Sequence, residues 1–153
     1  MDYNFAPIIL FAFNRPDVLR NTIQSLLLNE EAKFSDLYVF VDGPRSNKSG
    51  EEEKVKEVQE YVKSIEGFKS LHYTFSEKNK GLGNSIIAGV SQIINQYGKA
   101  IVLEDDLVFA KNFLSYMNQG LDRYEKEDKA FSICGYSNKV KIPHGYEYDS
   151  YFC

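Results

Sequence analysis

The sequence contains no tryptophan, only two cysteines and two histidines, and no apolar run long enough to cross a membrane. A membrane-spanning helix needs about 20 consecutive apolar residues. The apolar run from Pro7 to Phe13 is far shorter and follows the acidic Asp2 rather than a basic segment. We therefore expect neither a signal peptide nor a transmembrane segment. We expect a cytoplasmic protein, which is either free or attached peripherally to the inner face of the membrane.

Clustered positive charge and paired metal-binding cysteines are also missing. The net charge is −4 and no basic stripe is present, so we expect no nucleic-acid partner. Cys134 and Cys153 lie far apart, and neither has a spacing typical of metal ligands. Cys134 ends the apolar segment Ala130–Cys134, so we expect a buried, inert thiol in a reducing compartment. With 43% hydrophobic and 26% charged residues, the 153 residues are typical of one globular domain.

Short apolar runs alternate along the chain with segments whose apolar residues recur at helical spacing. We predict five strands: Pro7–Phe13, Leu37–Val41, Leu71–Phe75, Ala100–Leu103 and Ala130–Cys134. The segments between them are predicted helices, the first of which Asn14 is expected to cap, with Pro16 in the first turn. This alternation predicts an α/β fold of three layers, with helices on both faces of a largely parallel sheet.

Polar residues follow the first four predicted strands. They are Asn14-Arg15, Asp42-Gly43, the loop Lys78–Asn84 and the tripeptide Glu104-Asp105-Asp106. Ligands of parallel α/β sheets bind at the carboxyl ends of the strands, and these ends meet at one edge. The sequence therefore predicts a polar ligand site where the four groups converge.

The tripeptide Glu104-Asp105-Asp106 is the strongest of these signals. Three adjacent carboxylates repel one another, so either water screens them on a loop or a hard divalent cation binds among them. An isolated acidic tripeptide is usually a solvated surface, but its position directly after a buried strand favours the cation. Mg²⁺ or Mn²⁺ needs only one or two carboxylates plus phosphate oxygens and waters. A neighbouring acid is then free to accept hydrogen bonds from a ribose or sugar hydroxyl.

The other groups each allow a structural and a functional interpretation. Asp42 is either a turn former or an acceptor for the imide N–H of a uracil base. Arg15 lies at a helix start, where the helix dipole disfavours a cation, so it is either an exposed side chain or a base or phosphate contact. The loop around Lys80 and Gly81 is similar to a phosphate-binding loop but lacks the spacing of known nucleotide motifs. Its glycines are equally compatible with a helix entry.

Four segments, in this order, carry a family resemblance: Ile8–Pro16, Tyr38–Gly43, Asn79–Gly83 and Ile101–Leu107. Together they resemble the N-terminal, nucleotide-binding half of a GT-A fold glycosyltransferase. The likeness is to family 2-like bacterial sugar transferases and to the N-acetylglucosaminyltransferase I type. In that comparison Glu104-Asp105-Asp106 corresponds to the family's variant of the Asp-X-Asp motif. The resemblance covers Pro7 to about Ser137.

The resemblance implies a metal-dependent, inverting transfer of sugar from a nucleotide-diphosphate sugar, with UDP as the expected nucleotide, to an acceptor hydroxyl. The acceptor would be a glycan or a lipid-linked molecule. Asp106 would ligate Mn²⁺ or Mg²⁺ through the donor diphosphate. The residues implied to bind the nucleotide sugar are Ala12, Phe13, Asn14, Arg15, Asp42, Lys80, Gly81, Glu104 and Asp105.

The chain departs from the family pattern after the acidic motif. In the family, the catalytic base and most acceptor contacts come from a later stretch, and the tail carboxylates Glu147 and Asp149 have no matching context. We therefore expect residues 1–153 to be a single nucleotide-sugar-binding domain, truncated before the acceptor-binding part, with the base outside it.

Two other functions remain as alternatives. A nucleotidyltransferase would carry a glycine-rich, basic signature after the first strand, which Phe11–Arg15 does not supply. A noncatalytic α/β nucleotide-binding or signalling module of receiver type would place its acids after the first and third strands. Here the acids follow the fourth.

Overall fold

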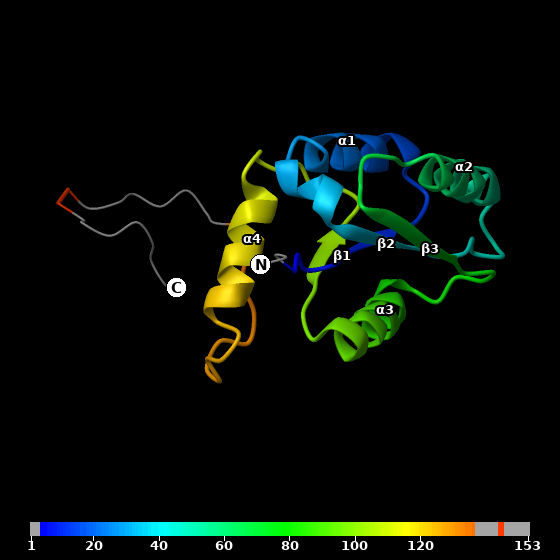
Figure 1. The fold of residues 1–153 in the computed structure, drawn as a ribbon. Helices are drawn as coiled ribbons and strands as arrows, with labels where there is room; N and C mark the ends of the chain where they lie inside the picture. The colour runs from blue at the N-terminus through cyan, green and yellow to red at the C-terminus, as the bar shows by residue number, and fades with distance from the viewer. Residues whose placement is uncertain (1–3, 137–143, 146–153) are drawn as a thin grey trace.

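The computed structural model describes residues 4–136 and 144–145. In these residues four parallel strands form one sheet in the order β3-β2-β1-β4 (Figure 1). The strands are β1 (Ile8–Ala12), β2 (Asp36–Val41), β3 (Ser70–Phe75) and β4 (Ile101–Glu104). The helices are α1 (Pro16–Leu26), α2 (Glu51–Lys63), α3 (Leu82–Tyr97) and α4 (Phe113–Arg123), with a 3-10 helix, η1 (Glu30–Phe34).

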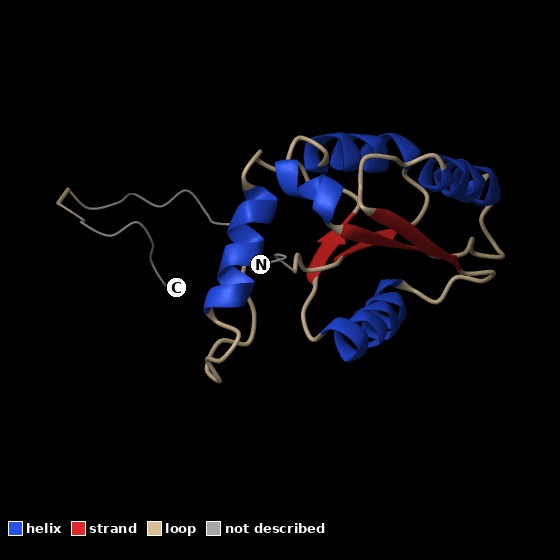
Figure 2. Cartoon of the chain, viewed as in Figure 1, coloured by secondary structure: helices blue, strands red, loops and turns tan. Residues whose placement is uncertain are grey.

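The sheet lies between two helical layers, which confirms the predicted three-layer α/β fold. Figure 2 shows α1 and α2 on one side of the sheet and α3 on the other. β1 is buried on both faces, which explains its uninterrupted apolar sequence. Ile8 and Leu10 belong to the core shared with α1 and α2, whereas Ile9 and Phe11 pack with Ile93 of α3.

Helical periodicity decides which faces of α1 and α2 are buried. Val55, Val58 and Val62 form an apolar stripe along α2, and each is at most 2% exposed. Burying one such side chain contributes about 1.5–3 kcal/mol relative to leaving it in water. Leu19 and Ile23 form the corresponding buried stripe of α1. Both helices therefore pack against the sheet through their apolar stripes.

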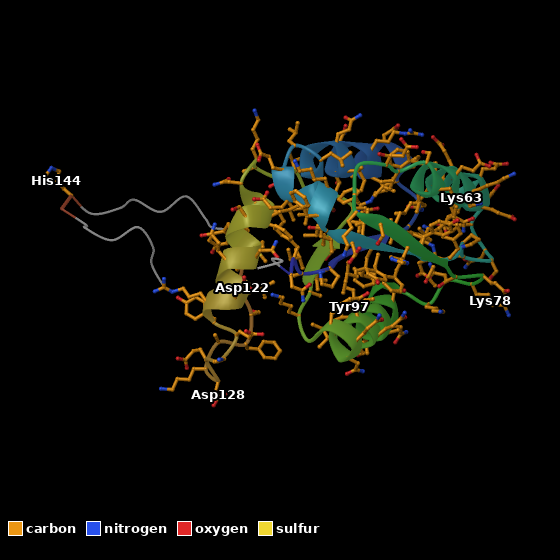
Figure 3. The ribbon with its side chains drawn as sticks, in the orientation of Figure 1. Lys63, Lys78, Tyr97, Asp122, Asp128 and His144 are labelled. Atoms are coloured by element: carbon orange, nitrogen blue, oxygen red, sulfur yellow. The ribbon has the colours of Figure 1, made fainter. Side chains whose placement is uncertain are left out.

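α4 lies beside the sheet rather than in either helical layer (Figure 1). Leu114 and Met117 join the core on the α1 side, and the buried Asn118 side chain accepts a hydrogen bond from the backbone N–H of Ala6 at 2.8 Å. Lys99, just before β4, forms an ion pair of 2.6 Å with Asp122 of α4, which is labelled in Figure 3. α4 is thus tied to the polypeptide just before both β1 and β4.

The predicted fifth strand is wrong, because Ala130–Cys134 forms no strand in the described structure. This segment lies against α4 instead: a Cβ atom on Gly120 would come within 3.0 Å of the Ile133 side chain, and the Tyr116 hydroxyl donates to the Cys134 carbonyl oxygen at 3.2 Å. Of its apolar side chains only Ala130 and Ile133 are partly buried, whereas Phe131 is fully exposed, so the segment lacks the burial that a core strand requires. Cys134 is exposed, so its expected burial is also wrong.

The start of α1 differs from the prediction as well. Arg15, not Asn14, is the N-terminal flanking residue of α1, and Pro16 follows it in the first turn. The Asn14 side chain instead donates to the carboxylate of Glu51 at 3.2 Å. A tertiary partner 37 residues away therefore replaces the expected cap.

In the part of the chain that the structure describes, no helix is both long enough and apolar enough to cross a bilayer. Cys153, Glu147 and Asp149 lie outside the described residues.

Candidate functional site

A cavity of about 360 Å³ lies at the carboxyl ends of β1, β2 and β4. The predicted site residues that line it are Ala12, Phe13, Arg15, Asp42, Gly81, Glu104 and Asp105. Asn14, Lys80 and Asp106 are not among its lining residues. The lining residues that were not named individually from the sequence are Phe11, Phe40, Arg45, Asn79, Leu82 and Ser85, although Asn79 and Leu82 belong to the predicted loop Lys78–Asn84. The structure therefore brings together residues from all four of the predicted polar groups.

The acidic tripeptide meets Arg15 at this cavity. Nη2 of Arg15 donates to Oδ1 of Asp105 and, at 3.2 Å, to Oδ2 of Asp106. Two carboxylate oxygens from adjacent residues therefore point at one nitrogen atom. The side chain of Asp105 is only 5% exposed, whereas those of Arg15 and Asp106 are 47% and 45% exposed. The pair joins a buried acid to a cation at the protein surface.

Burial determines the electrostatics of Asp105. It raises the pKa of the Asp105 carboxyl above its ordinary value, and the neighbouring charge of Asp106 acts in the same direction. The hydrogen bond from Arg15 and a further one from the backbone N–H of Phe13 lower the pKa but do not outweigh burial. The hydrogen bond to Asp105 in turn raises the pKa of Arg15, so the arginine is a permanent positive charge at this position.

Asp42 fixes the loop that follows β3. Its Oδ1 accepts hydrogen bonds from the backbone N–H groups of Gly43 and Lys80, and its Oδ2 accepts one from Gly81, each at 2.9 Å. Two carboxylate oxygens offer about four acceptor positions. Asp42 therefore has a structural role of its own and keeps acceptor capacity at Oδ2 toward the cavity that it lines.

The same loop passes so close to Gly43 that a side chain does not fit there. A Cβ atom on Gly43 would lie 2.5 Å from the carbonyl carbon of Lys78 and 2.7 Å from the Ser76 oxygen, both backbone atoms. Asn79 completes the contact by donating from Nδ2 to the Gly43 carbonyl oxygen at 2.9 Å. Lys78 lies on this loop at the end of the sheet where β3 ends (Figure 3). Gly43 thus permits the approach that Asp42 then holds.

Arg45 reaches the cavity from the loop after β2. Its backbone N–H and its Nε and Nη2 atoms all donate to the carboxylate of Glu51, the first residue of α2. The guanidinium carbon lies 5.4 Å from the ring centroid of Phe13. The hydrogen bonds from Arg45 lower the pKa of Glu51 to about 2. Nothing local to Arg45 in the sequence indicates this anchorage, because its partner lies in the next helix.

Aromatic rings form the apolar wall of the cavity. Phe11 of β1 and Phe40 of β2 stack with ring centroids 5.5 Å apart. Both rings contact α3 at Gly89, where an added Cβ atom would come within 3.0 Å of Phe11 and 3.1 Å of Phe40. The signal that could have found them is strand alternation: Phe11 and Phe40 are ladder partners that point to the α3 face.

Buried polar side chains of α1 fix the polypeptide that follows the acidic tripeptide. Thr22 donates to the carbonyl oxygen of Asp105 at 2.7 Å, and Ser25 accepts from the N–H of Phe109 at 3.0 Å. Asn29, just beyond the helix, accepts from the N–H of Leu114 at 2.9 Å. These three side chains are 8% exposed or less. They hold the backbone of residues 105–114 along α1.

Asp105 and Asp106 could each supply a carboxylate oxygen to a divalent cation. Among residues 4–136 and 144–145, no three His, Cys, Asp or Glu side chains gather to hold a metal by themselves. A magnesium-type site needs fewer, because phosphate oxygens and waters supply the other ligands. Oδ1 of Asp105 and Oδ2 of Asp106 already share one positive partner, Nη2 of Arg15. The donor set therefore fits a hard cation.

Comparison with known proteins identifies the family. Residues 8–145 match the family described as "Glycosyl transferase family 2". The chain belongs to glycosyl transferase family 2. This match extends from the start of β1 past α4.

Solved structures agree on the fold. Two are crystal structures of S. aureus TarS, one of them of residues 1–349, and both match with a TM-score of 0.55. Sequence identity is 14% and 15%, and each match covers 80% of this chain. The chain covers 20% of the first TarS structure and 33% of the second, so it spans a third or less of them. The likeness confirms the predicted GT-A type of α/β fold.

Proposed function

We propose that this chain is the donor-binding part of a metal-dependent, inverting glycosyltransferase that takes its sugar from a nucleotide-diphosphate sugar, with UDP as the nucleotide. The observation that carries the proposal is the convergence of Asp105 and Asp106 on one cation position at a cavity that also contains Asp42. Family membership supports the reaction class. The acceptor is a hydroxyl of a glycan or a lipid-linked molecule.

The diphosphate end of the donor belongs at the acids. Asp106 is the proposed metal ligand, and its exposed carboxylate leaves room for phosphate oxygens and waters. Glu104 and Asp105 line the cavity, so they are placed to accept hydrogen bonds from ribose or sugar hydroxyls. A divalent cation bound there would neutralise the charge that develops on the departing nucleoside diphosphate.

The base end of the donor belongs between Asp42 and the aromatic wall. The remaining acceptor position on Oδ2 of Asp42 suits the imide N–H of uracil. Phe11 and Phe40 offer apolar surface beside it. Ala12 and Phe13 line the same cavity, and Gly81 allows the loop to approach the ligand closely. Lys80 and Asn14 are sequence neighbours of the lining residues Gly81 and Arg15, and we include them in the proposed donor site.

The sugar transfer also needs a carboxylate that accepts the acceptor's proton. We assign no such base within the described residues. Binding of the donor is therefore the part of the reaction to test on this chain.

Calorimetric titration with UDP, with and without Mn²⁺, tests the proposal directly. The expected result is UDP binding that requires Mn²⁺ and is lost in Asp106→Ala, while the circular dichroism spectrum of the variant is unchanged. Asp128→Ala, an exposed acid after α4, is the matched control and should bind as the wild type does. UDP binding that is equal with and without Mn²⁺, or unchanged in Asp106→Ala, would contradict the assignment of Asp106.

The nucleotide preference is tested separately by comparing UDP with CDP. Asp42→Ala should weaken UDP binding more than CDP binding, because N3 of uracil carries a proton that Asp42 can accept in a hydrogen bond, whereas N3 of cytosine carries none. Equal losses for UDP and CDP would remove Asp42 as a base contact and leave its role in the loop.

A further inference from the structure

Arg15 occupies the position that the acids offer to a cation. It follows β1 directly and flanks the start of α1, and its Nη2 atom lies between the carboxylates of Asp105 and Asp106. The partners lie 90 and 91 residues away in the sequence. A cation at a helix start is disfavoured by the helix dipole, so the pairing with the acids is what holds Arg15 there.

The acids need this positive charge when no other cation is bound. Asp105 is nearly buried beside a second carboxylate, and an unpaired buried charge is strongly destabilising. The pairing is nevertheless incomplete on the arginine side. In residues 4–136 and 144–145, the hydrogen bonds of the Arg15 guanidinium all come from Nη2. Its other N–H groups remain available to a ligand in the cavity that Arg15 lines.

Arg15 differs in this respect from the other arginine at the cavity. Arg45 is committed to Glu51 through its backbone N–H, Nε and Nη2 atoms. Arg15 uses a single nitrogen and its side chain is 47% exposed. Arg15 can therefore exchange its partners without breaking the hydrogen bonds that hold a loop, whereas Arg45 cannot.

We propose that Arg15 is an internal counter-cation of the acid pair Asp105 and Asp106, that it competes with the divalent cation for Asp106, the proposed metal ligand, and that it exchanges the acids for the donor diphosphate. The inference rests on the proposed function and adds a mechanism of coupling to it. Divalent cation alone must displace Arg15 and leave it without a partner. Nucleoside diphosphate together with the cation supplies phosphate oxygens to which a planar guanidinium binds well.

The exchange makes the two ligands cooperative. The cation takes the carboxylates from Arg15, and the diphosphate takes the guanidinium that the cation releases. Each ligand therefore raises the affinity for the other by the same factor, as thermodynamic linkage requires. The site would thereby discriminate against free divalent cation and favour cation that arrives with a nucleoside diphosphate.

Opposite effects on two affinities distinguish this role from a structural one. In Arg15→Gln the competing charge is gone, so Mn²⁺ alone should bind more tightly, by about tenfold, the factor that a lost charge-assisted hydrogen bond corresponds to. UDP in the presence of saturating Mn²⁺ should bind more weakly, also by about tenfold. Damage to the fold would weaken both.

The experiment measures free Mn²⁺ by electron paramagnetic resonance and UDP binding by calorimetry on the same samples. Arg20→Gln removes an arginine from the same helix whose ion pair with Glu57, at 3.8 Å, is remote from the acids. This control should leave both affinities unchanged. Arg15→Lys, which keeps the charge without the planar fork, should retain weak binding of Mn²⁺ alone and lose UDP affinity.

Each outcome decides the proposal. Tighter Mn²⁺ binding with weaker UDP binding in Arg15→Gln supports it. Weaker Mn²⁺ binding, or no change in either affinity, overturns the proposed competition between Arg15 and the cation. The proposed function is not affected by that result as long as the wild type shows Mn²⁺-dependent UDP binding. If neither the wild type nor any variant binds Mn²⁺ or UDP, both proposals are overturned.

Discussion

The hydroxyl of Thr22 donates a hydrogen bond to the backbone carbonyl oxygen of Asp105 at 2.7 Å, and both groups are buried. The bond connects the middle of α1 to the residue that carries the buried acid of the site. The hydrogen bond fixes the peptide plane that follows Asp105 and so ties the backbone of the acidic tripeptide to α1.

Replacing Thr22 by valine keeps the shape of the side chain and removes only the donor. We expect Thr22→Val to lower the free energy of unfolding by about 1–3 kcal/mol, because the Asp105 carbonyl is left buried without its partner. Urea unfolding measures this loss. Thr74→Val on the exposed surface of β3 is the control, expected within about 0.5 kcal/mol of the wild type. Equal stability of the two variants would show that the hydrogen bond contributes nothing.

Gly43 should tolerate no side chain. A Cβ atom there would lie 2.5 Å from backbone carbon of Lys78, and backbone cannot move aside as a flexible side chain does. We expect Gly43→Ala to destabilise the protein by about 1–3 kcal/mol, the usual cost of overpacking. Gly83→Ala in the first turn of α3, where a Cβ atom meets nothing within 4 Å, should instead be neutral or stabilise by up to about 1 kcal/mol. Thermal unfolding of both variants compares them, and a neutral Gly43→Ala would contradict the close approach.

The carboxylate of Asp42 should control the dynamics of the loop that follows β3. Asp42→Asn replaces one acceptor oxygen by an amide nitrogen, which cannot accept from the N–H groups of Gly81 or Lys80. We expect amide hydrogen exchange at one or both of these positions to accelerate by about tenfold, corresponding to one lost hydrogen bond. Asp36→Asn at the opposite end of β2 should leave them unchanged. Unaltered exchange in Asp42→Asn would mean that the loop is held elsewhere.

Acid should weaken the anchorage of Arg45. The pKa of Glu51 is lowered from 4.5 to about 2 by its hydrogen bonds with Arg45, so the folded state favours the carboxylate. The stability that this group contributes is complete above pH 4.5 and is lost as the pH falls toward 2. Urea unfolding between pH 2 and 7 measures it.

Two variants separate Glu51 from the general effect of acid. Glu51→Gln should be less stable than the wild type at neutral pH and lose less stability below pH 4.5. Glu53→Gln, exposed in the same turn of α2, should follow the wild-type curve. If the stability of Glu51→Gln falls with acid as steeply as that of the wild type, Glu51 does not carry the dependence.

Much of the fold could be predicted because the relevant signals are local. The uninterrupted apolar run of β1 indicates a strand buried on both faces, and the spacing of Val55, Val58 and Val62 indicates a helix with one buried stripe. The order of these elements then predicts the parallel sheet. Ala130–Cys134 has the same local appearance as a strand, and only the tertiary structure shows that Ile133 packs against α4 while Phe131 is exposed.

The candidate site divides in the same way. Sequence placed Asp42 and the acidic tripeptide at strand ends, and the carboxyl edge of a parallel sheet brings such ends together. Arg45, Phe11 and Phe40 were missed, because their roles depend on partners that lie in other elements.

By itself the sequence determined the four strands of the sheet, the helical stripes and the polar groups that follow the strands, since residue pattern and backbone geometry act over a few neighbouring residues. Only the tertiary structure decided which charges meet. Arg15 pairs with Asp105, which lies 90 residues away in the sequence. The Asn14 side chain bonds to Glu51, 37 residues away, instead of capping α1. Electrostatic and hydrogen-bond energies depend on the distance between two groups in space and on their burial, and both are fixed only when the sheet has formed.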